Sequence, residues 1–265
     1  MEQAESVPFQ ELRRVTFVSP HPDDVELCCG ILIRRLIRSG IEVNYLCVTD
    51  GAPVEQDHAN LTSLPPNYDR LAYKSNRRRE TTTALDVLGV EPGCIEFLDY
   101  PDLGTLNHIH SIVEDFGAML KDVDGVFCCP FEGGHPDHDV CRFALFASAR
   151  LSAYSGKMFE YASYNVRGYQ VFLKNSPDDF TIIAEPEEEQ FQKRVAEVFV
   201  SQKEMAIQFK TNIECFRQVH TMFKAEQFLA YDETPDYEQF AFPGSHVLHK
   251  IREYMLLRFG IAEAY

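Results

Sequence analysis

The sequence lacks any apolar run that approaches the ~18 residues of a membrane span. Its apolar stretch Ile31-Leu32-Ile33, for example, is followed at once by Arg34 and Arg35. Residues 1–6 also lack the basic region and apolar core of a signal peptide. We therefore expect no membrane span and no secretory signal, and a cytoplasmic location.

Basic residues are scarce. The chain has 25 Lys and Arg against 41 Asp and Glu, which gives a formal net charge of −16. A surface this acidic repels phosphate backbones and anionic membranes, so nucleic-acid binding is not expected. The run Arg77-Arg78-Arg79 is an exception within a helical pattern, and a solvated helix face is its simplest explanation.

The cysteines form no C-x-x-C pair. Of the eight, Cys28-Cys29 and Cys128-Cys129 are adjacent in sequence, a placement that suits neither an intrachain disulfide nor a tetrahedral zinc site. Most of the others also lie in apolar segments. We interpret them as small core residues in a reducing compartment.

What the chain does have is a hexapeptide that joins a strand to a helix, Ser19-Pro20-His21-Pro22-Asp23-Asp24. Residues 14–18 are rich in β-branched and aromatic side chains, which predicts a buried strand. Residues 25–37 have the spacing of apolar residues and the length that predict a helix. Open α/β sheets bind ligands at such carboxyl-terminal turns. The alternative is that Asp23 and Asp24 merely cap the helix, whose N-terminus favours negative charge.

A second turn of the same kind follows. Residues 124–129 predict another buried strand, which leads into Gly133-Gly134-His135-Pro136-Asp137-His138 and a helix over residues 140–151. Because the carboxyl ends of parallel strands share one edge of a sheet, we expect the two turns to meet. Helix capping does not explain two His-rich turns in matching places.

The remaining pattern predicts an α/β fold: a Rossmann-like, mostly parallel sheet with helices on both faces, plus a C-terminal hairpin and a helical extension. A length of 265 residues with 45% apolar content suits a single domain, with a core over about residues 13–185 and the extension over about 186–265. Further strands are expected at residues 41–49 and 94–98, helices at 70–89, 105–121 and 186–210, a hairpin from 159–166 and 169–174, and a long loop at 52–69 that forms one wall of a substrate site.

The two turns carry the residue types of a catalytic zinc site. Such a site uses three protein ligands and keeps one position open. His21 and Asp24 can supply two ligands, and the third can come from either His135 or His138. The metal would lower the pKa of a bound water from ~15.7 toward ~7.

The other polar side chains of the turns suit proton transfer. Asp23, a free carboxylate beside the metal, can act as general base. The histidine not used as a ligand can act as general acid or stabilise an oxyanion. Asp137 can orient one imidazole through its ring N–H.

Residues 19–24 and 133–138 together resemble the two signature motifs of the LmbE-like (PIG-L type) zinc de-N-acetylases. That family includes enzymes that act on GlcNAc-phosphatidylinositol and on the sugar precursors of mycothiol and bacillithiol. The resemblance covers about residues 13–150 and includes Thr49-Asp50-Gly51, Arg77 with Glu80, and Tyr100-Pro101-Asp102. It implies a Rossmann-like fold with Zn²⁺ as cofactor. The chain has Gly133 where some members carry a tyrosine.

The resemblance also implies roles, residue by residue. It makes His21, Asp24 and His138 the metal ligands, Asp23 the general base, His135 the acid or oxyanion stabiliser, Asp137 a partner behind the ligands, and Arg77 and Asp102 contacts to sugar hydroxyls. With these roles, Asp137 is expected to favour the charged form of His135 and to raise its pKa.

We therefore expect a zinc-dependent hydrolase that removes an N-acetyl or other N-acyl group from an amino sugar or glycoconjugate. One alternative is other amide, N-dealkylation or iron-dependent chemistry on the same two-His, one-Asp set. Another is a nucleotide-binding module, against which the first turn lacks G-x-G-x-x-G and its Asp-Asp pair would repel phosphate. The expected partner is a small N-acetylated sugar, and assembly into a homo-oligomer is compatible with the sequence.

Overall fold

The structure is a computed structural model that describes residues 9, 11–54, 64, 67–220, 225–240 and 242–261. The predicted loop at 52–69 lies largely outside the described residues, which omit 55–63, 65 and 66. In the parts of the chain that are described, no helix has the length and apolar character needed to cross a membrane.

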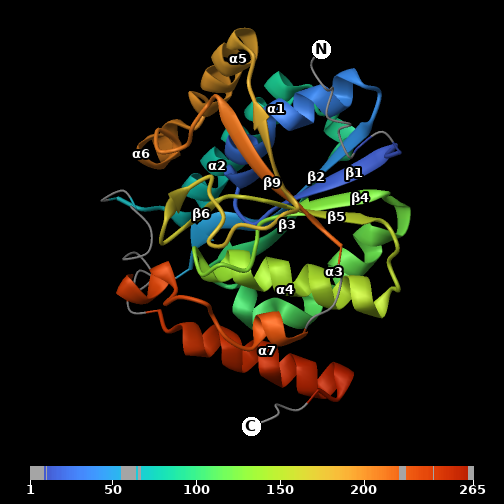
Figure 1. The fold of residues 1–265 in the computed structure, drawn as a ribbon. Helices are drawn as coiled ribbons and strands as arrows, with labels where there is room; N and C mark the ends of the chain where they lie inside the picture. The colour runs from blue at the N-terminus through green and yellow to red at the C-terminus, as the bar shows by residue number, and fades with distance from the viewer. Residues whose placement is uncertain are drawn as a thin grey trace.

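A seven-stranded sheet runs through the middle of the molecule in the order β3-β2-β1-β4-β5-β9-β8 (Figure 1). Neighbouring strands from β3 to β5 pair in parallel, whereas β9 pairs antiparallel with both β5 and β8. The predicted fold class, a mostly parallel α/β sheet, is confirmed. The strands are β1 (Arg14–Ser19), β2 (Glu42–Pro53), β3 (Ile95–Asp102), β4 (Gly125–Cys128), β5 (Lys157–Tyr161), β8 (Asp179–Ile183) and β9 (Ile213–Val219).

Helices cover both faces of the sheet. α1 (Asp24–Arg38), α2 (Arg70–Leu88) and α5 (Pro186–Ala196) contact one another on one face, and α3 (Ile109–Met119), α4 (Pro136–Leu151) and α7 (Gly244–Phe259) lie on the other (Figure 1). The short helices are η2 (Pro92–Cys94), η3 (Thr105–His108), η4 (Leu120–Asp122), η5 (Val200–Gln202), α6 (Lys203–Ala206), η6 (Ala225–Phe228) and η7 (Asp236–Phe240).

The order of strands places the two turns together. β1 lies between β2 and β4, and its register pairs Val15 with Gly125 and Phe17 with Phe127. From β1 the chain continues to β2 and β3, which lie on one side of β1, and then to β4, which lies on the other side of β1. The strand order therefore reverses at β1. Doubly wound folds bind ligands at such a switch point, outside the carboxyl ends of the strands.

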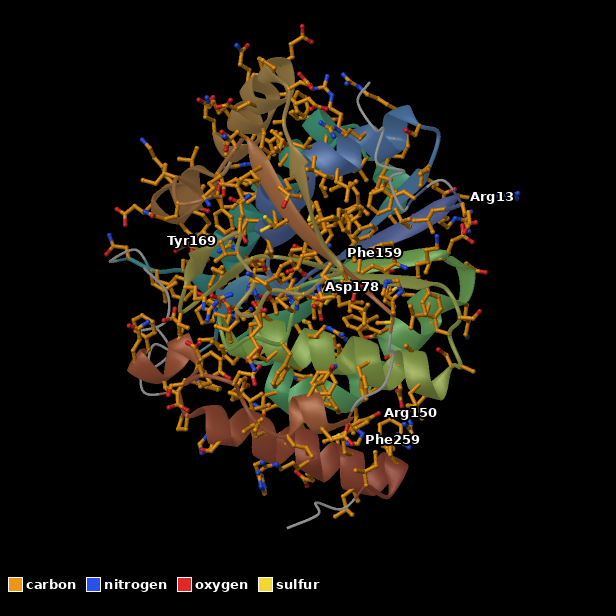
Figure 2. All side chains as sticks on the ribbon, in the orientation of Figure 1. Arg13, Arg150, Phe159, Tyr169, Asp178 and Phe259 are labelled. Carbon is orange, nitrogen blue, oxygen red and sulfur yellow. The ribbon has the colours of Figure 1, made fainter. Side chains whose placement is uncertain are left out.

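Aromatic rings fill the core below this edge. The ring of Phe127 stacks on Phe17 at 4.4 Å and on Phe159 at 4.6 Å between centroids, and all three are buried. Figure 2 shows Phe159 near the middle of the sheet, and it shows Arg150 beside Phe259 where α4 meets α7. Each such buried aromatic ring contributes about 1.5–3 kcal/mol by the removal of apolar surface from water, so these rings stabilise the sheet that carries the turns.

Three sequence predictions differ from the structure. The strand expected at 159–166 instead begins in the main sheet as β5, and the hairpin shrinks to β6 (Tyr164–Asn165) and β7 (Gly168–Tyr169). The helix expected over 186–210 ends at Ala196, because Phe199 adopts a non-helical conformation that buries its ring. The part expected to be a helical extension also contributes β9 to the sheet.

Two elements of the C-terminal third, β9 and α5, form hydrogen bonds with α1, the helix that follows the first turn. Glu214 of β9 accepts hydrogen bonds from Ile31 N at 2.7 Å and Leu32 N at 3.0 Å, in the middle of that helix. Gln192 of α5 donates to the carbonyl of Glu26 at 2.7 Å. The C-terminal third is therefore built into the domain that positions the turns.

Candidate metal centre

The turn after β1 is held by its own backbone and side chains. Ser19 Oγ donates to the carbonyl of His21 at 2.6 Å and accepts from Val25 N at 3.2 Å. Asp24 Oδ2 accepts from His21 N at 2.9 Å. Asp23 occupies the N-cap position of α1 but makes no side-chain capping bond, so the capping interpretation fails for Asp23.

Three side chains from the two turns converge. His21 Nδ1 lies 3.1 Å from Asp24 Oδ2 and 3.2 Å from His138 Nε2, and His138 Nε2 lies 3.0 Å from Asp24 Oδ2. All three residues are buried, and their ligand atoms lie within 4.8 Å of one another. Two imidazole nitrogens that face one carboxylate oxygen form the donor set of a divalent zinc or iron ion. These residues therefore fit the predicted metal.

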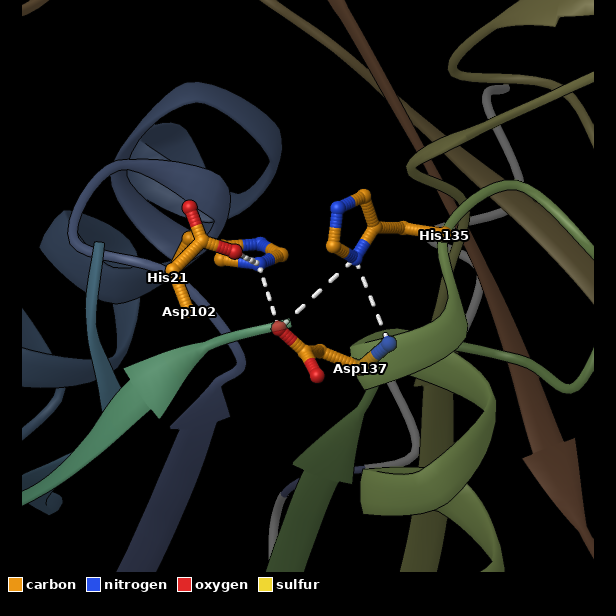
Figure 3. Close-up of side chains that lie close together, drawn as sticks. All are labelled: His21, Asp102, His135 and Asp137. Atoms are coloured by element: carbon orange, nitrogen blue, oxygen red, sulfur yellow. Dashed lines mark hydrogen bonds and ion pairs between the residues drawn. The ribbon is translucent and has the colours of Figure 1, made fainter. Parts of the chain in front are cut away.

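A second group lies around His21 and consists of Asp102, His135 and Asp137 (Figure 3). His21 Nε2 lies 3.2 Å from Asp137 Oδ2 and 3.3 Å from Asp102 Oδ1. This second group and His21 would also meet the spacing for a metal. The hydrogen bonds already made by the group favour a different role.

The carboxylate of Asp137 accepts hydrogen bonds from residues that follow β3. Its Oδ2 accepts from Leu103 N at 2.7 Å, and its Oδ1 accepts from Thr105 N at 3.3 Å and from the Thr105 hydroxyl. A carboxylate so engaged is suited to orient a ligating imidazole rather than to bind the metal itself. The imidazole nearest to the Asp137 carboxylate is that of His21, whose Nε2 lies 3.2 Å from Oδ2, whereas His135 Nδ1 lies 3.9 Å from the same oxygen.

The charges of the centre are strongly interdependent. Burial disfavours the charged form of His21, but Asp102, Asp137 and Asp24 outweigh it and raise the pKa of His21 well above its ordinary value. Burial likewise opposes ionisation of Asp24, yet the nearby His138 and His21 hold the pKa of Asp24 well below its usual range. The pKa of Asp102 is lowered in the same way by His21. A positive charge at this point is thus favoured by the surrounding carboxylates.

Asp23 stands beside this cluster with one oxygen engaged and one free. Its Oδ2 accepts from the Arg77 guanidinium at 2.9 Å, and its Oδ1 is buried without a hydrogen-bond partner among the described residues. Burial raises the pKa of Asp23 to about 6, against the opposing charge of Arg77. This is a carboxylate able to exchange a proton near neutral pH.

Arg77 and Asp102 are more deeply buried than we expected for residues that contact a sugar. Both side chains are about 5% exposed, and they contact Asp23 and His21 respectively. The structure therefore shows them supporting the central residues. The sugar contacts that the resemblance implies for them stay a prediction.

His135 differs from the expectation in its electrostatics. Its Nδ1 accepts a hydrogen bond from Asp137 N at 3.2 Å. Burial, together with the charge of His21, lowers the pKa of His135 to about 3, although Asp137 acts in the opposite direction. The expected rise in this pKa is wrong, because desolvation outweighs one carboxylate. A neutral imidazole whose other nitrogen carries the hydrogen is a donor suited to an oxyanion.

Asp139 is a residue that the sequence analysis missed. Its Oδ1 accepts from Glu132 N and Gly133 N, both at 3.1 Å. Its Oδ2 accepts from the hydroxyls of Tyr231 at 2.8 Å and Tyr237 at 3.0 Å. The carboxylate follows His138 directly in sequence, which was an available signal. The two distant tyrosines carried no such signal.

Gly133 has a structural reason for its departure from the tyrosine of some family members. Its φ is +73°, in the left-handed region that favours glycine, and a Cβ there would lie 2.9 Å from Pro235 Cα. The segment with Pro235, Asp236 and Tyr237 packs against this turn, and Asp236 N donates to the carbonyl of Gly133 at 2.7 Å. A tyrosine would be strained at this position.

Solved structures of deacetylases share the fold. A zinc-inhibited teicoplanin deacetylase superposes with a TM-score of 0.60 at 17% identity, over 77% of this chain and 97% of that one. N,N'-diacetylchitobiose deacetylase from Pyrococcus horikoshii superposes with a TM-score of 0.56 at 20% identity, over 80% of this chain and 85% of that one. At these identities the likeness establishes the α/β architecture.

The family follows from the sequence match. The family model described as GlcNAc-PI de-N-acetylase (PIG-L) matches residues 16–149, half of the chain. The chain therefore belongs to the PIG-L family, whose two signature turns build the centre described above.

Two relatives extend this comparison. Diacetylchitobiose deacetylase from Thermococcus kodakarensis is 30% identical over 155 residues, 56% of this chain and 52% of the relative. A probable N-acetyl-alpha-D-glucosaminyl L-malate deacetylase from Bacillus cereus is 26% identical over 132 residues, 48% of this chain and 57% of the relative. The chain thus spans about half the length of each of these relatives.

Proposed function

We propose that this protein is a metal-dependent hydrolase that removes an N-acetyl or other N-acyl group from an amino sugar or glycoconjugate. One observation carries the proposal. His21, Asp24 and His138 converge within 4.8 Å at the switch point of the sheet, and Asp23 offers an unpartnered buried oxygen beside them. Membership of the PIG-L family supports the same chemistry.

His21, Asp24 and His138 would hold the metal, which we propose to be zinc because two imidazoles and one carboxylate suit it. When bound, zinc supplies a Lewis acid that polarises the acyl group and acidifies water at neutral pH. Asp137 and Asp102 fix the orientation of His21 from behind. The ligand geometry is thus set before any substrate arrives.

Asp23 then moves the protons of the hydrolysis. Its free Oδ1 takes a proton from the attacking water, whose oxygen forms a bond with the acyl carbon. The C–N bond then breaks, and the same proton passes to the departing amine. The products are an amine and a carboxylic acid, and the acid releases the second proton of the water to solvent as it becomes a carboxylate. Arg77 holds Asp23 in place at 2.9 Å. His135 donates its ring N–H to the acyl oxygen as negative charge develops there.

The proposed substrate class is N-acetylated sugars. Support comes from the names of the relatives, a diacetylchitobiose deacetylase and a probable N-acetylglucosaminyl-malate deacetylase. We further propose a reducing, cytoplasmic setting. All eight cysteines are free and six of them are buried as core residues, which suits a reducing compartment. Cell fractionation tests this location.

Metal analysis combined with an amine-release assay tests the function. The full chain, loaded with zinc, is incubated with N-acetylglucosamine, diacetylchitobiose and N-acetylglucosaminides that carry an anionic aglycone. We expect one zinc per chain and release of a primary amine from at least one of these substrates. Stoichiometric zinc with no amine from any of them would overturn the proposal. Turnover that needs iron and oxygen would instead support the alternative chemistry on the same ligands.

A further inference from the structure

The segment that follows β3 makes a tight turn against Asp137. Leu103 has a φ of +61°, a left-handed backbone conformation that bulky residues rarely adopt. The next residue, Gly104, has no room for a side chain, since a Cβ there would lie 2.9 Å from the carbonyl oxygen of Pro101. Strained backbone of this kind is concentrated at functional sites, so this turn is a candidate part of the metal centre.

The turn surrounds the carboxylate of Asp137 with hydrogen-bond donors. Leu103 N donates to Oδ2 at 2.7 Å, and Thr105 donates to Oδ1 both from its backbone N, at 3.3 Å, and from its hydroxyl. Thr105 and Asp137 are buried, with exposed fractions of 0% and 1%, so water does not compete for these bonds. Backbone N–H groups gathered around a left-handed residue form a concavity that binds an anion. The turn therefore holds Asp137 by both of its oxygens.

These donors fix which oxygen of Asp137 faces His21. Oδ2 stands 3.2 Å from His21 Nε2 (Figure 3), while Nδ1 of the same ring faces Asp24 and His138. A rotation of the carboxylate would break both hydrogen bonds from Thr105. A carboxylate that accepts from the Nε2 hydrogen holds an imidazole in the tautomer whose Nδ1 lone pair is free for a metal. Thr105 therefore acts on a candidate ligand through Asp137.

We propose that Thr105 is a positioning residue of the metal centre. Its hydroxyl fixes the carboxylate of Asp137, and Asp137 fixes the ring of His21 with Nδ1 directed at the metal position. The proposal rests on the ligand set given under the proposed function. It makes β3 a further strand that serves the centre, beside β1 and β4. Because a ligand held in its binding orientation loses less freedom when it binds, the hydroxyl of Thr105 should contribute to metal affinity.

The test measures zinc affinity by competition with a chromogenic chelator. Thr105→Val keeps the shape and the backbone N–H of the residue but removes the hydroxyl, so the Kd for zinc should rise roughly 10-fold, as is typical for partners of metal ligands. Thr105→Ser retains a hydroxyl and should stay within about 2-fold of the wild type. Ser148→Ala is the matched control, since the Ser148 hydroxyl is also buried and lies 2.7 Å from the carbonyl oxygens of Val113 and Ala144, near the other end of α4. This variant should keep the wild-type Kd.

Two further measurements separate positioning from a general effect on the fold. In Asp137→Ala the carboxylate is absent, so adding Thr105→Val should change the Kd for zinc by less than about 2-fold. The absorption bands of the Co²⁺-loaded protein report the geometry of the ligands, and they should change in Thr105→Val but not in Ser148→Ala. Thr105→Ala, a second variant without the hydroxyl, should match Thr105→Val in both measurements. Thermal unfolding of the metal-free proteins records any loss of stability separately.

The outcomes are distinct. Wild-type zinc affinity in Thr105→Val overturns the role of Thr105 while the proposed function stands. Equal weakening with and without the Asp137 carboxylate also overturns it, because Thr105 would then not act through Asp137. A Thr105→Ser variant as weak as Thr105→Val rejects the hydroxyl as the cause. If the wild-type chain binds zinc but releases no amine, the proposed activity fails and the role of Thr105 stands, whereas a wild-type chain that binds no zinc overturns both.

Discussion

Asp23 has one oxygen on Arg77 and one oxygen with no partner among the described residues. A structural carboxylate at this depth normally has both oxygens hydrogen-bonded, because an unsatisfied buried acceptor costs about 1–3 kcal/mol. Asp23 directly precedes Asp24, one of the three candidate metal ligands. The unpartnered oxygen of Asp23 destabilises the fold, and destabilising features of this kind are typical of catalytic residues.

Asp23→Asn tests that interpretation. The amide keeps the shape of the carboxylate but cannot accept a proton, so kcat should fall roughly 10²–10⁴-fold while zinc is retained. Steady-state kinetics with parallel metal analysis measures both. Asp179→Asn is the matched control, since Asp179 is also ion-paired with an arginine, Arg217 at 2.6 Å, but lies on β8. Near-wild-type turnover in zinc-loaded Asp23→Asn would reject the base.

His138→Ala tests the ligand set. His138 contacts both of the other candidate ligands, so its loss opens a three-ligand site and tightly bound zinc should be lost. Atomic absorption on the dialysed protein measures the metal. His246→Ala, which changes an exposed histidine on α7, should retain the wild-type content. Stoichiometric zinc in His138→Ala contradicts the assignment.

At the scale of elements, the turn that carries His135 and His138 is held by a segment from the C-terminal third. Tyr231 and Tyr237 close onto Asp139, and the ring of Phe131 stacks on Tyr231 with centroids 4.9 Å apart. The two hydroxyls donate hydrogen bonds to the carboxylate of Asp139, which is fully buried. The C-terminal segment is thus a clamp on the second turn.

Replacing both tyrosines with phenylalanine removes two donors from the buried Asp139 and leaves the rings in place. We expect a loss of about 1–3 kcal/mol per unsatisfied group, seen as a lower Tm, and faster removal of zinc by a chelator because the turn is less fixed. Tyr100→Phe serves as the control, since its hydroxyl also donates to a carboxylate, Asp115 on α3, at 2.7 Å. An equal rate of zinc loss in both variants would show that the clamp does not act on the metal site.

The sequence predicted the elements whose contacts are local. β1, α1, β4 and α4 follow from hydrophobic periodicity, and α2 ends at Gly89 in the expected left-handed cap. The meeting of the two turns followed from the rule that parallel strands share an edge. The break in the helix after Ala196 and the pairing of β9 depend on tertiary contacts, the burial of Phe199 and the antiparallel edge of β5.

The same division applies to the site. His21, Asp23, Asp24 and His138 stand in contiguous motifs, and the structure brings them together. Tyr231 and Tyr237 come from a segment with no motif, so their contact with Asp139 depends on how the C-terminal segment packs. The pKa of His135 depended on burial, which the sequence does not contain.

On the scale of the whole molecule, the C-terminal third also sets how stability varies with pH. Burial raises the pKa of Glu214 from 4.5 to about 8, although Ile31 N and Leu32 N act against this. Between these two values the folded chain holds a proton that the unfolded chain has released. The free energy of unfolding therefore falls as pH rises through this window.

Glu214→Gln removes that titration. Each pKa unit is worth about 1.4 kcal/mol, so from pH ~5 to ~9 the variant should gain on the order of a few kcal/mol relative to the wild type. Thermal unfolding across this range measures the difference in Tm. Glu96→Gln, an exposed glutamate on β3, should show a constant difference. A constant difference for Glu214→Gln would mean that the carboxyl is ionised in the folded state.

The clamp on the second turn has a consequence for how the protein is made. During synthesis, His21 and His138 are added to the chain long before Tyr231 and Tyr237. In multidomain proteins, the N-terminal domains generally fold first during synthesis. In a chain that has not yet reached Tyr231 and Tyr237, Asp139 lacks the two hydroxyl donors that hold the second turn. We therefore expect a bound metal to exchange faster in such a chain than in the protein in which both tyrosines are in place.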